Sequence, residues 1–117
     1  MKYFIVLISA LLSMSCTENI EFSESFGGID FDEGYDIDLT PEGDIILTGV
    51  FSKEFFYRGD ALLKSKGSYD IFVCKIDTSG EIKWANSIGE KRKDLVYNSS
   101  LDKDGNIYTC GYTKIKN

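Results

Sequence analysis

The sequence predicts an all-β fold built from antiparallel, four-stranded units. Three observations predict it. Short segments either alternate apolar with polar residues or are mostly apolar, and glycines lie in the turns between them. The sequence pattern around Gly43 recurs 62 residues later around Gly105. No segment has the helical apolar spacing and the length that a crossover between parallel strands requires.

The first residues, "MKYFIVLISALLSMSC", are expected to be a leader and not part of the fold. Lys2 is followed by an apolar run, Tyr3–Leu12. As a helix this run would span only about 15 Å, half of a bilayer's hydrocarbon core. A positive start, a short apolar centre and small residues before Cys16 are typical of a secretory signal peptide, predicted over residues 1–15.

The same segment resembles a bacterial lipoprotein signal, in which a cysteine after a small residue is diacylated and becomes the mature N-terminus. The resemblance implies lipidation of Cys16 and an exported protein at the cell envelope, in the outer membrane. The usual leucine lies three residues before the cysteine, whereas Leu12 lies four before it. Ordinary cleavage near Ser15 and a retained anchor are the alternatives. The acidic residues 16–25 are then expected to form a tether.

An internal repeat places residues 25–51 on residues 87–113 with a shift of 62 and no gap. Eight of these 27 positions are identical, more than unrelated sequences share by chance. The identical pairs are Ser25/Ser87, Gly27/Gly89, Asp32/Asp94, Tyr35/Tyr97, Leu39/Leu101, Gly43/Gly105, Ile45/Ile107 and Gly49/Gly111.

The first hairpin of the repeat is predicted over residues 35–51. Tyr35–Leu39 alternates large apolar with acidic residues, the period of a half-buried strand. Thr40–Asp44 is a turn in which Gly43 can take a positive φ, and Ile45–Phe51 returns as a second, more apolar strand.

Two further hairpins follow the same pattern. "DIFVCKID" and "IKWANSI" are joined by a turn in which Gly80 has the role of Gly43. "SLDKDGNIYTCGY" then repeats the first hairpin, with Gly105 in its turn. Between the first two hairpins, Ser52–Tyr69 is longer and less regular, and it is predicted to contain a loop that crosses to the next strand.

One period therefore holds four short antiparallel strands, which is typical of a β-propeller blade. We expect a first blade-like repeat at residues 26–87 and a partial second repeat at residues 88–117. Propellers close with about 4–8 blades, so about one and a half blades make an incomplete propeller. We expect the chain to be a piece of a longer reading frame. The alternatives are that it completes a ring with copies of itself or with another chain, or that it folds alone as a small sandwich.

The residues from about Phe26 to Tyr112 also resemble the bacterial SBBP-type β-propeller repeat. The resemblance implies a secreted or surface propeller and does not imply one activity. Three positions depart from the family pattern: Cys74 replaces an alanine, Glu90 replaces the second glycine, and Val96 replaces the glycine two residues past Asp94. The matching residues are Gly27, Gly28, Asp32, Gly34, Tyr35, Ile37, Gly43, Ile45, Thr48, Gly49, Phe51, Asp70–Val73, Lys75, Asp77, Gly80 and Trp84.

Cys74 and Cys110 lie inside apolar strand patterns, "IFVCKI" and "IYTCGY". An exported compartment permits a disulfide, but we expect two buried thiols that pack as small apolar side chains. No cysteine spacing indicates a zinc site, and no metal or other cofactor is expected.

Several segments carry residues that could do chemistry, and each has a structural alternative that is favoured. "DKDGN", 102–106, is predicted to be a turn and not a calcium loop, because its glycine is fourth. "FDEGYDID", 31–38, places Asp36 and Asp38 on a face opposite its apolar residues, predicted to be solvated; with Asp30, Asp32 and Glu33 a cation site is the alternative. The aromatic residues of Glu54–Asp60 are expected in the core or between blades, although they could stack on a sugar or peptide.

Composition narrows the function. The net charge is −6 with no basic stripe, which argues against a nucleic-acid partner, and the chain has no histidine, which argues against an enzyme. We therefore expect a binding or scaffolding module at the cell envelope, with no catalytic residues identified. The expected partners are the membrane through the N-terminal lipid, a glycan or protein ligand, and other copies of the chain through open blade edges. The alternatives are a fragment of a propeller hydrolase or lyase acting on polysaccharide, and a truncated remnant of a longer propeller lipoprotein.

Overall fold

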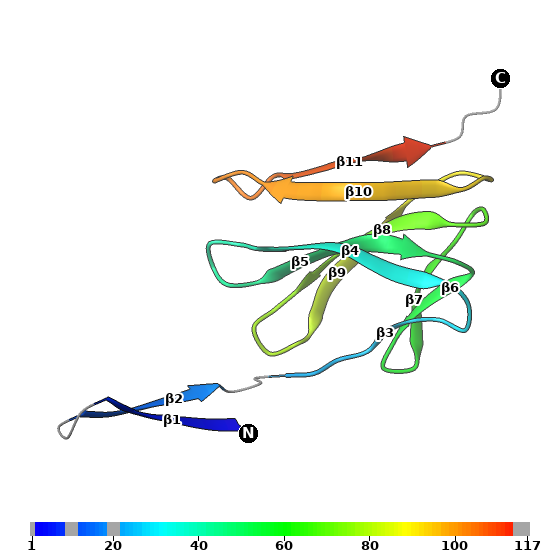
Figure 1. Cartoon of the computed structure of the whole chain (residues 1–117). Helices are drawn as coiled ribbons and strands as arrows, with labels where there is room; N and C mark the ends of the chain where they lie inside the picture. The colour runs from blue at the N-terminus through cyan, green and yellow to red at the C-terminus, as the bar shows by residue number, and fades with distance from the viewer. Residues whose placement is uncertain (1, 9–11, 19–21, 114–117) are drawn as a thin grey trace.

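The computed structural model describes residues 2–8, 12–18 and 22–113, and every regular element in these ranges is a β-strand (Figure 1). The all-β prediction is confirmed. Within the same ranges, no helix has the length and apolar character needed to cross a membrane. The strands are β1 (Lys2–Ile8), β2 (Leu12–Glu18), β3 (Phe26–Gly27), β4 (Asp32–Leu39), β5 (Ile45–Phe51), β6 (Glu54–Tyr57), β7 (Asp60–Lys64), β8 (Asp70–Ile76), β9 (Ile82–Ile88), β10 (Asp94–Leu101) and β11 (Ile107–Thr113).

The four-stranded sheet β4–β5–β8–β9 is the predicted blade. It consists of the two predicted hairpins, β4–β5 and β8–β9, joined side by side as an antiparallel pair of β5 with β8. The separate sheet β10–β11 is the first half of a second blade. Among the described residues, the sheets have two to four strands and none closes into a barrel.

The repeat holds in three dimensions as well as in sequence. β4 pairs with β5 from Asp32 opposite Phe51 to Leu39 opposite Ile45. Adding 62 to each number gives the register of β10 with β11, from 94 opposite 113 to 101 opposite 107. Both pairs also carry a bulge at the same place, at Tyr35 and at Tyr97, where one extra residue enters the strand.

The three predicted turn glycines share one conformation. Gly43, Gly80 and Gly105 have φ of 89°, 90° and 82°, a region that favours glycine. Each backbone N–H donates to the carbonyl oxygen three residues earlier, at 2.9, 3.0 and 3.1 Å. The predicted role of these glycines is confirmed.

A side chain at the start of each turn accepts backbone N–H groups. In the third turn, Asp102 Oδ1 accepts the N–H of Asp104 and of Asn106, each at 2.9 Å. In the second turn Asp77 Oδ1 does the same, and in the first turn the Thr40 hydroxyl accepts one such bond. The turn interpretation of "DKDGN" is therefore confirmed.

The sheets stack in three layers, with β10–β11 on one face of the four-stranded sheet and β3–β6–β7 on the other (Figure 1). Even-numbered residues of β5 face β10, and odd-numbered residues face β3–β6–β7, as the two-residue period of a strand requires. Each face therefore has its own core. The first core is Ile46, Val50, Ile71, Val73 and Val96; the second is Phe51, Phe55, Phe72, Cys74 and Ile76.

The segment Ser52–Tyr69 differs from the prediction, because it contains the hairpin β6–β7 and not only a crossing loop. A two-residue turn joins its strands, with positive φ at Arg58 (50°) and Gly59 (90°), the conformation that matches the twist of a hairpin. Phe55 of β6 is buried, with its ring centroid 4.6 Å from that of Phe72. This agrees with the expected packing role of the aromatic residues.

The prediction for the faces of β4 was wrong. Asp36 is half-buried beneath β10, whereas Ile37 and Leu39 are 61% and 69% exposed. The alternation itself is present, but the covered face is the acidic one, because Ser99 of β10 donates two hydrogen bonds to the Asp36 carboxylate. Tertiary packing thus decided which side of the strand is buried.

The two cysteines differ from each other. Cys74 and Cys110 are both free, which agrees with the preference for thiols over a bridge. Cys74 is buried as expected, but Cys110 is exposed, because no further sheet of the described chain covers β11. The expectation of burial was therefore wrong for Cys110.

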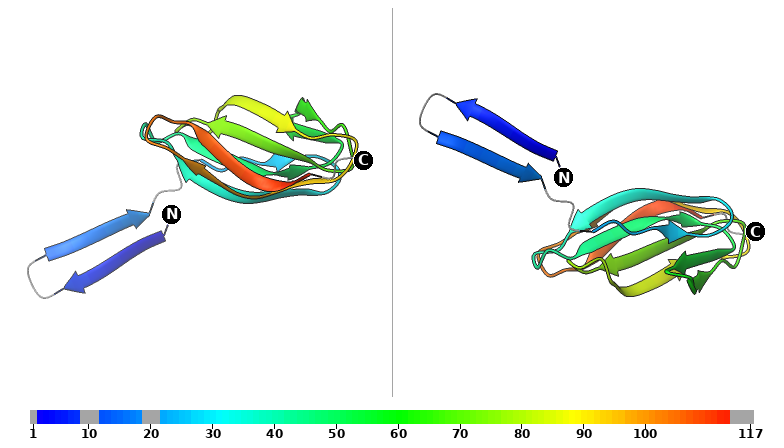
Figure 2. Two further views of the ribbon diagram at one scale, coloured as in Figure 1. Left: turned by 90° about the horizontal axis from the view of Figure 1, so that it is seen from above. Right: turned by 90° about the horizontal axis from the view of Figure 1, so that it is seen from below.

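The N-terminal segment forms the hairpin β1–β2, in which Phe4 lies opposite Cys16. In Figure 2 this hairpin lies apart from the stacked sheets. A signal peptide over residues 1–15 and lipidation of Cys16 concern processing of the chain, and they stay predictions. Residues 19–21 of the expected tether and residues 114–117 of the partial second repeat lie outside the described residues.

Candidate functional site

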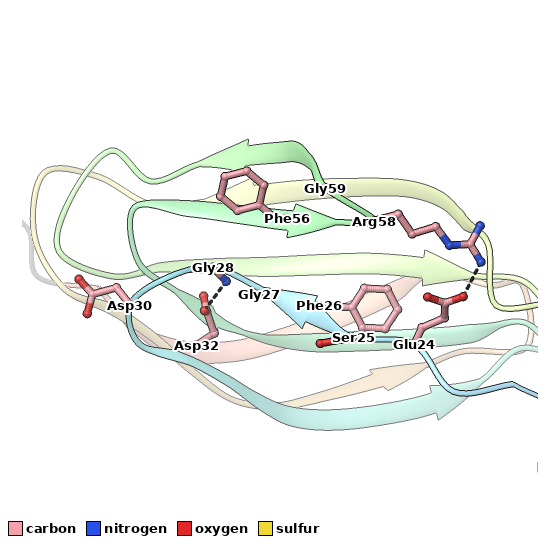
Figure 3. A pocket seen from close by; sticks show the side chains of 10 residues that line it. All are labelled: Glu24, Ser25, Phe26, Gly27, Gly28, Asp30, Asp32, Phe56, Arg58 and Gly59. Carbon is pink, nitrogen blue, oxygen red and sulfur yellow. Dashed lines mark hydrogen bonds and ion pairs between the residues drawn. The ribbon is translucent and has the colours of Figure 1, made fainter.

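A groove of about 600 Å³ lies between the segment that enters the fold at β3 and the hairpin β6–β7 (Figure 3). It is open to solvent along its length, and two aromatic rings contribute to a wall that is otherwise polar or glycine. The lining residues are Glu24, Ser25, Phe26, Gly27, Gly28, Asp30, Asp32, Phe56, Arg58 and Gly59.

Paired charges define one end of the groove. The Arg58 guanidinium pairs with Glu24 and with Glu81, and it lies 4.9 Å from the centre of the Tyr57 ring. The hydrogen bond from Arg58 lowers the pKa of the Glu24 carboxyl. This end therefore presents a fixed network of ionised groups at neutral pH.

Asp30 lies at the opposite end of the groove in Figure 3. Its carboxylate is 3.0 Å from the Lys53 ammonium, which lowers the pKa of the Asp30 carboxyl. Both carboxyls thus remain ionised in neutral solution. A general acid for glycoside cleavage needs the reverse, a carboxyl whose pKa is raised so that it keeps its proton.

Asp32 also lines the groove. Its Oδ2 accepts the Gly28 N–H at 2.6 Å, which closes the loop before β4. Its Oδ1 is buried and has no hydrogen-bond partner within the described chain.

The same carboxylate-closed loop occurs before two other strands. Asp94, the residue 62 positions after Asp32, accepts the Glu90 N–H at 2.9 Å, and its buried Oδ1 also lacks a described partner. Asp70 accepts the Lys66 N–H in the same way, but its Oδ1 accepts the Ser65 hydroxyl at 2.9 Å. The residue five positions before Asp32 and Asp94 is glycine, which has no hydroxyl to donate.

A second groove, of about 480 Å³, lies around Asp94 between the loop after β9 and strand β11. Lys66 and Glu90 are the charged side chains beside Asp94 there, and Ile71 and Ile88 form its apolar part. In the parts of the chain that the structure describes, no cluster of three cysteine, aspartate or glutamate residues has the arrangement of a metal site.

The sequence-predicted sites are distributed over different places. Cys16 is on β2, and the three turn glycines shape hairpin ends that do not line either groove. Of the acidic residues considered for a cation, Asp30 and Asp32 line the first groove, whereas Asp36 lies in the joint between sheets. They are not brought together in one site.

Two important groove residues, Glu24 and Arg58, were missed by sequence reasoning. They are 34 positions apart, and nothing local in the sequence links them. The pair Arg58–Gly59 between apolar residues was a usable hairpin signal, and it would have placed the guanidinium at a turn.

Comparisons of the chain with protein-family models, with curated proteins and with solved structures found no match.

Proposed function

We propose that this chain is an exported binding or scaffolding module of the cell envelope, built on SBBP-like propeller blades and held at the outer membrane by lipid on Cys16. The support for export is the positive start, the short apolar run and the small residues before Cys16. The ligand proposed for the groove is a glycan or an extended peptide.

The single observation that carries the binding role is the open groove of Figure 3, which aromatic, charged and glycine residues line together. The Phe56 ring offers apolar surface, and the Arg58 guanidinium offers directed donors, whereas the Phe26 ring stacks on Tyr57 and packs against the second core. Sugars and peptides combine apolar faces with hydrogen-bonding groups, so this lining suits them. The lowered pKa values of Glu24 and Asp30 favour binding over acid catalysis.

Lipidation is tested by metabolic labelling of the whole chain with a radioactive palmitate in a bacterium that processes lipoproteins. Cys16→Ala is expected to abolish the label, whereas Cys110→Ala, which changes the exposed thiol of β11, leaves it unchanged. Label that survives Cys16→Ala would show that Cys16 is not the lipidated residue.

Binding is tested on glycan and peptide arrays with purified chain. A ligand of the groove is expected to be lost in Phe56→Ser and in Arg58→Gln, and to be retained in Lys103→Gln, a charge change in the distant third turn. A ligand that binds all four proteins equally would place its site elsewhere.

A further inference from the structure

Within the described part of the chain, no other strand covers the outer face of β11. Tyr108, Cys110 and Tyr112 are all exposed there, with Tyr108 at 59%. Subtracting 62 gives their equivalents in the first blade, which are buried beneath β10. The equivalents are Ile46, Thr48 and Val50.

A second face that no described strand covers lies on β4, the edge strand of the four-stranded sheet. Ile37 and Leu39 of β4 are exposed on the side that faces away from β10. Their equivalents in the second blade are Ser99 and Leu101, which lie against the first blade: Ser99 is buried, and Leu101 packs against the core that β5 and β8 share. β4 therefore exposes the positions that β10 uses to dock.

The joint inside the chain shows how these two faces fit. β10 lies over β4 and β5, and the Ser99 and Thr48 hydroxyl oxygens lie 3.1 Å apart, within hydrogen-bonding distance. From this template we propose that copies of the chain associate head to tail, with β4 of one copy on the outer face of β10–β11 of the preceding copy. In that arrangement Ile37 of one copy lies against Cys110 of the other.

The side chains at the two faces fit an apolar contact. Strand β11, "IYTCGYT", carries no charge, so a docking strand meets no ionised group on it. In the contact between copies, Ile37 takes the place of Ser99 and Cys110 takes the place of Thr48, so a polar pair is replaced by a largely apolar one. The charged Asp36 is likewise replaced by the neutral Asn98. Burying two exposed apolar faces against each other is the usual force for association.

Both faces belong to the same chain, and the chain already contains one example of their joint, so the occupant we infer is a second copy. The two surfaces differ, so the contact is heterologous and forms a ring or an open filament. This inference rests on the proposed scaffolding function and gives it a partner. Its test uses a chain with Cys16→Ser, so that failure of assembly and failure of lipidation are seen separately.

The experiment is disulfide trapping of the full chain carrying Cys16→Ser and Ile37→Cys under mild oxidation. Cys110 of one copy and the new thiol of the next are expected to form a ladder of dimers, trimers and larger species on non-reducing gels. The ladder is expected to disappear when Cys110→Ser is added. Moving the new thiol to Leu62, an exposed position on β7 that is not in either face, is expected to give no ladder.

The template itself is checked by Thr48→Cys with Ser99→Cys in the chain that also carries Cys16→Ser and Cys110→Ser. This pair is expected to close a disulfide within one chain, which shows that the equivalent positions are near enough to cross-link. If this internal bridge forms while Ile37→Cys yields only monomer at the highest soluble concentration, the head-to-tail inference is overturned. A dimer through Cys110 of both copies, with nothing larger, would also overturn it and indicate edge pairing of two β11 strands.

A second measurement needs no disulfide. Sedimentation of the chain with Cys16→Ser alone is expected to show species larger than the monomer, and Ile37→Asp or Tyr108→Glu is expected to remove them. Both positions are exposed, so circular dichroism of the variants is expected to match the parent. Assembly that persists in both variants contradicts the proposal.

Discussion

The Asp36 Oδ2 atom accepts the backbone N–H of Ser99 at 2.7 Å, although 63 positions separate the two residues. The Ser99 hydroxyl donates to the same oxygen and also lies 3.1 Å from the Thr48 hydroxyl. A polar cluster thus fixes the position of β10 on the first blade, in the middle of an otherwise apolar joint. Buried polar contacts of this kind select one alignment of two sheets, because sliding would leave the groups unpaired.

We predict that Ser99→Ala lowers the free energy of unfolding by about 1 kcal/mol, because the hydroxyl contacts to Asp36 and Thr48 are lost in a buried place. Urea denaturation followed by tryptophan fluorescence measures it. Ser100→Ala, on the exposed side of the same strand, is the matched control and is expected to have no measurable effect. Equal stability of all three proteins would mean that the cluster contributes nothing.

We predict that Gly49→Ala lowers the free energy of unfolding by about 1–3 kcal/mol, which is the typical cost of overpacking a core. A Cβ at Gly49 would collide with the carbonyl oxygen of Glu33 and with the Phe72 ring. Gly34 lies directly opposite Gly49, and a Cβ there would meet only Leu47 Cδ1 at an ordinary 3.6 Å. Gly34→Ala should therefore keep the thermal midpoint near that of the parent; a similar drop in both variants would contradict the packing argument.

The thiols of Cys74 and Cys110 should react at different rates. Burial raises the pKa of Cys74 to about 12, so it is neither ionised nor accessible at pH 8, whereas Cys110 is exposed. In a chain with Cys16→Ser, a chromogenic disulfide reagent is expected to modify one thiol rapidly and the second only after denaturant is added. Cys110→Ser should remove the rapid phase, and a rapid phase that survives this change would show that Cys74 is accessible.

Acid should weaken the fold. The pKa of Asp44 is lowered by the Lys83 and Lys75 ammonium groups at 3.1 and 3.2 Å, and the pKa of Asp77 and of Asp102 is lowered by the hydrogen bonds of their turns. These carboxyls bind protons less readily in the folded than in the unfolded chain. Their contribution to the free energy of unfolding is therefore fully present above the pKa of the unfolded chain, near 3.8. It is lost as the pH falls through the lower pKa values of the folded chain.

The measurement is the urea midpoint of the purified chain between pH 7 and pH 2. The midpoint is expected to be level down to about pH 5 and then to fall. Asp102→Asn keeps a capping oxygen in the third turn but cannot titrate, so its curve should fall less steeply than that of the parent. A midpoint that rises on acidification would contradict the assignment.

The parts of the fold that could be predicted from sequence depend on local geometry. The turns at Gly43, Gly80 and Gly105 need a positive φ, which glycine adopts more readily than other residues. The alternation of residue types in Tyr35–Leu39 follows from the pleat of a strand. The register of β10 with β11 follows from that of β4 with β5, because the spacing of 62 holds without a gap.

The rest depended on contacts between distant residues. The sequence could not show that the acidic side of β4 is the covered one, because that is decided by Ser99 on another sheet. It could not bring Glu24 to Arg58 for the same reason. The exposure of Cys110 depends on whether another sheet lies over β11, which a strand pattern cannot reveal.

The shared numbering of the two sheet pairs has an evolutionary consequence. In the described residues, β10 of the second unit docks on β4 and β5 of the first, and the strands at this joint follow the same register 62 positions apart. A duplication or in-frame loss of a whole 62-residue segment would therefore preserve the docking chemistry, whereas an insertion of any other size within a strand would shift it. Genes for such proteins can lengthen or shorten by whole units through recombination, and selection then needs to adjust only the two ends.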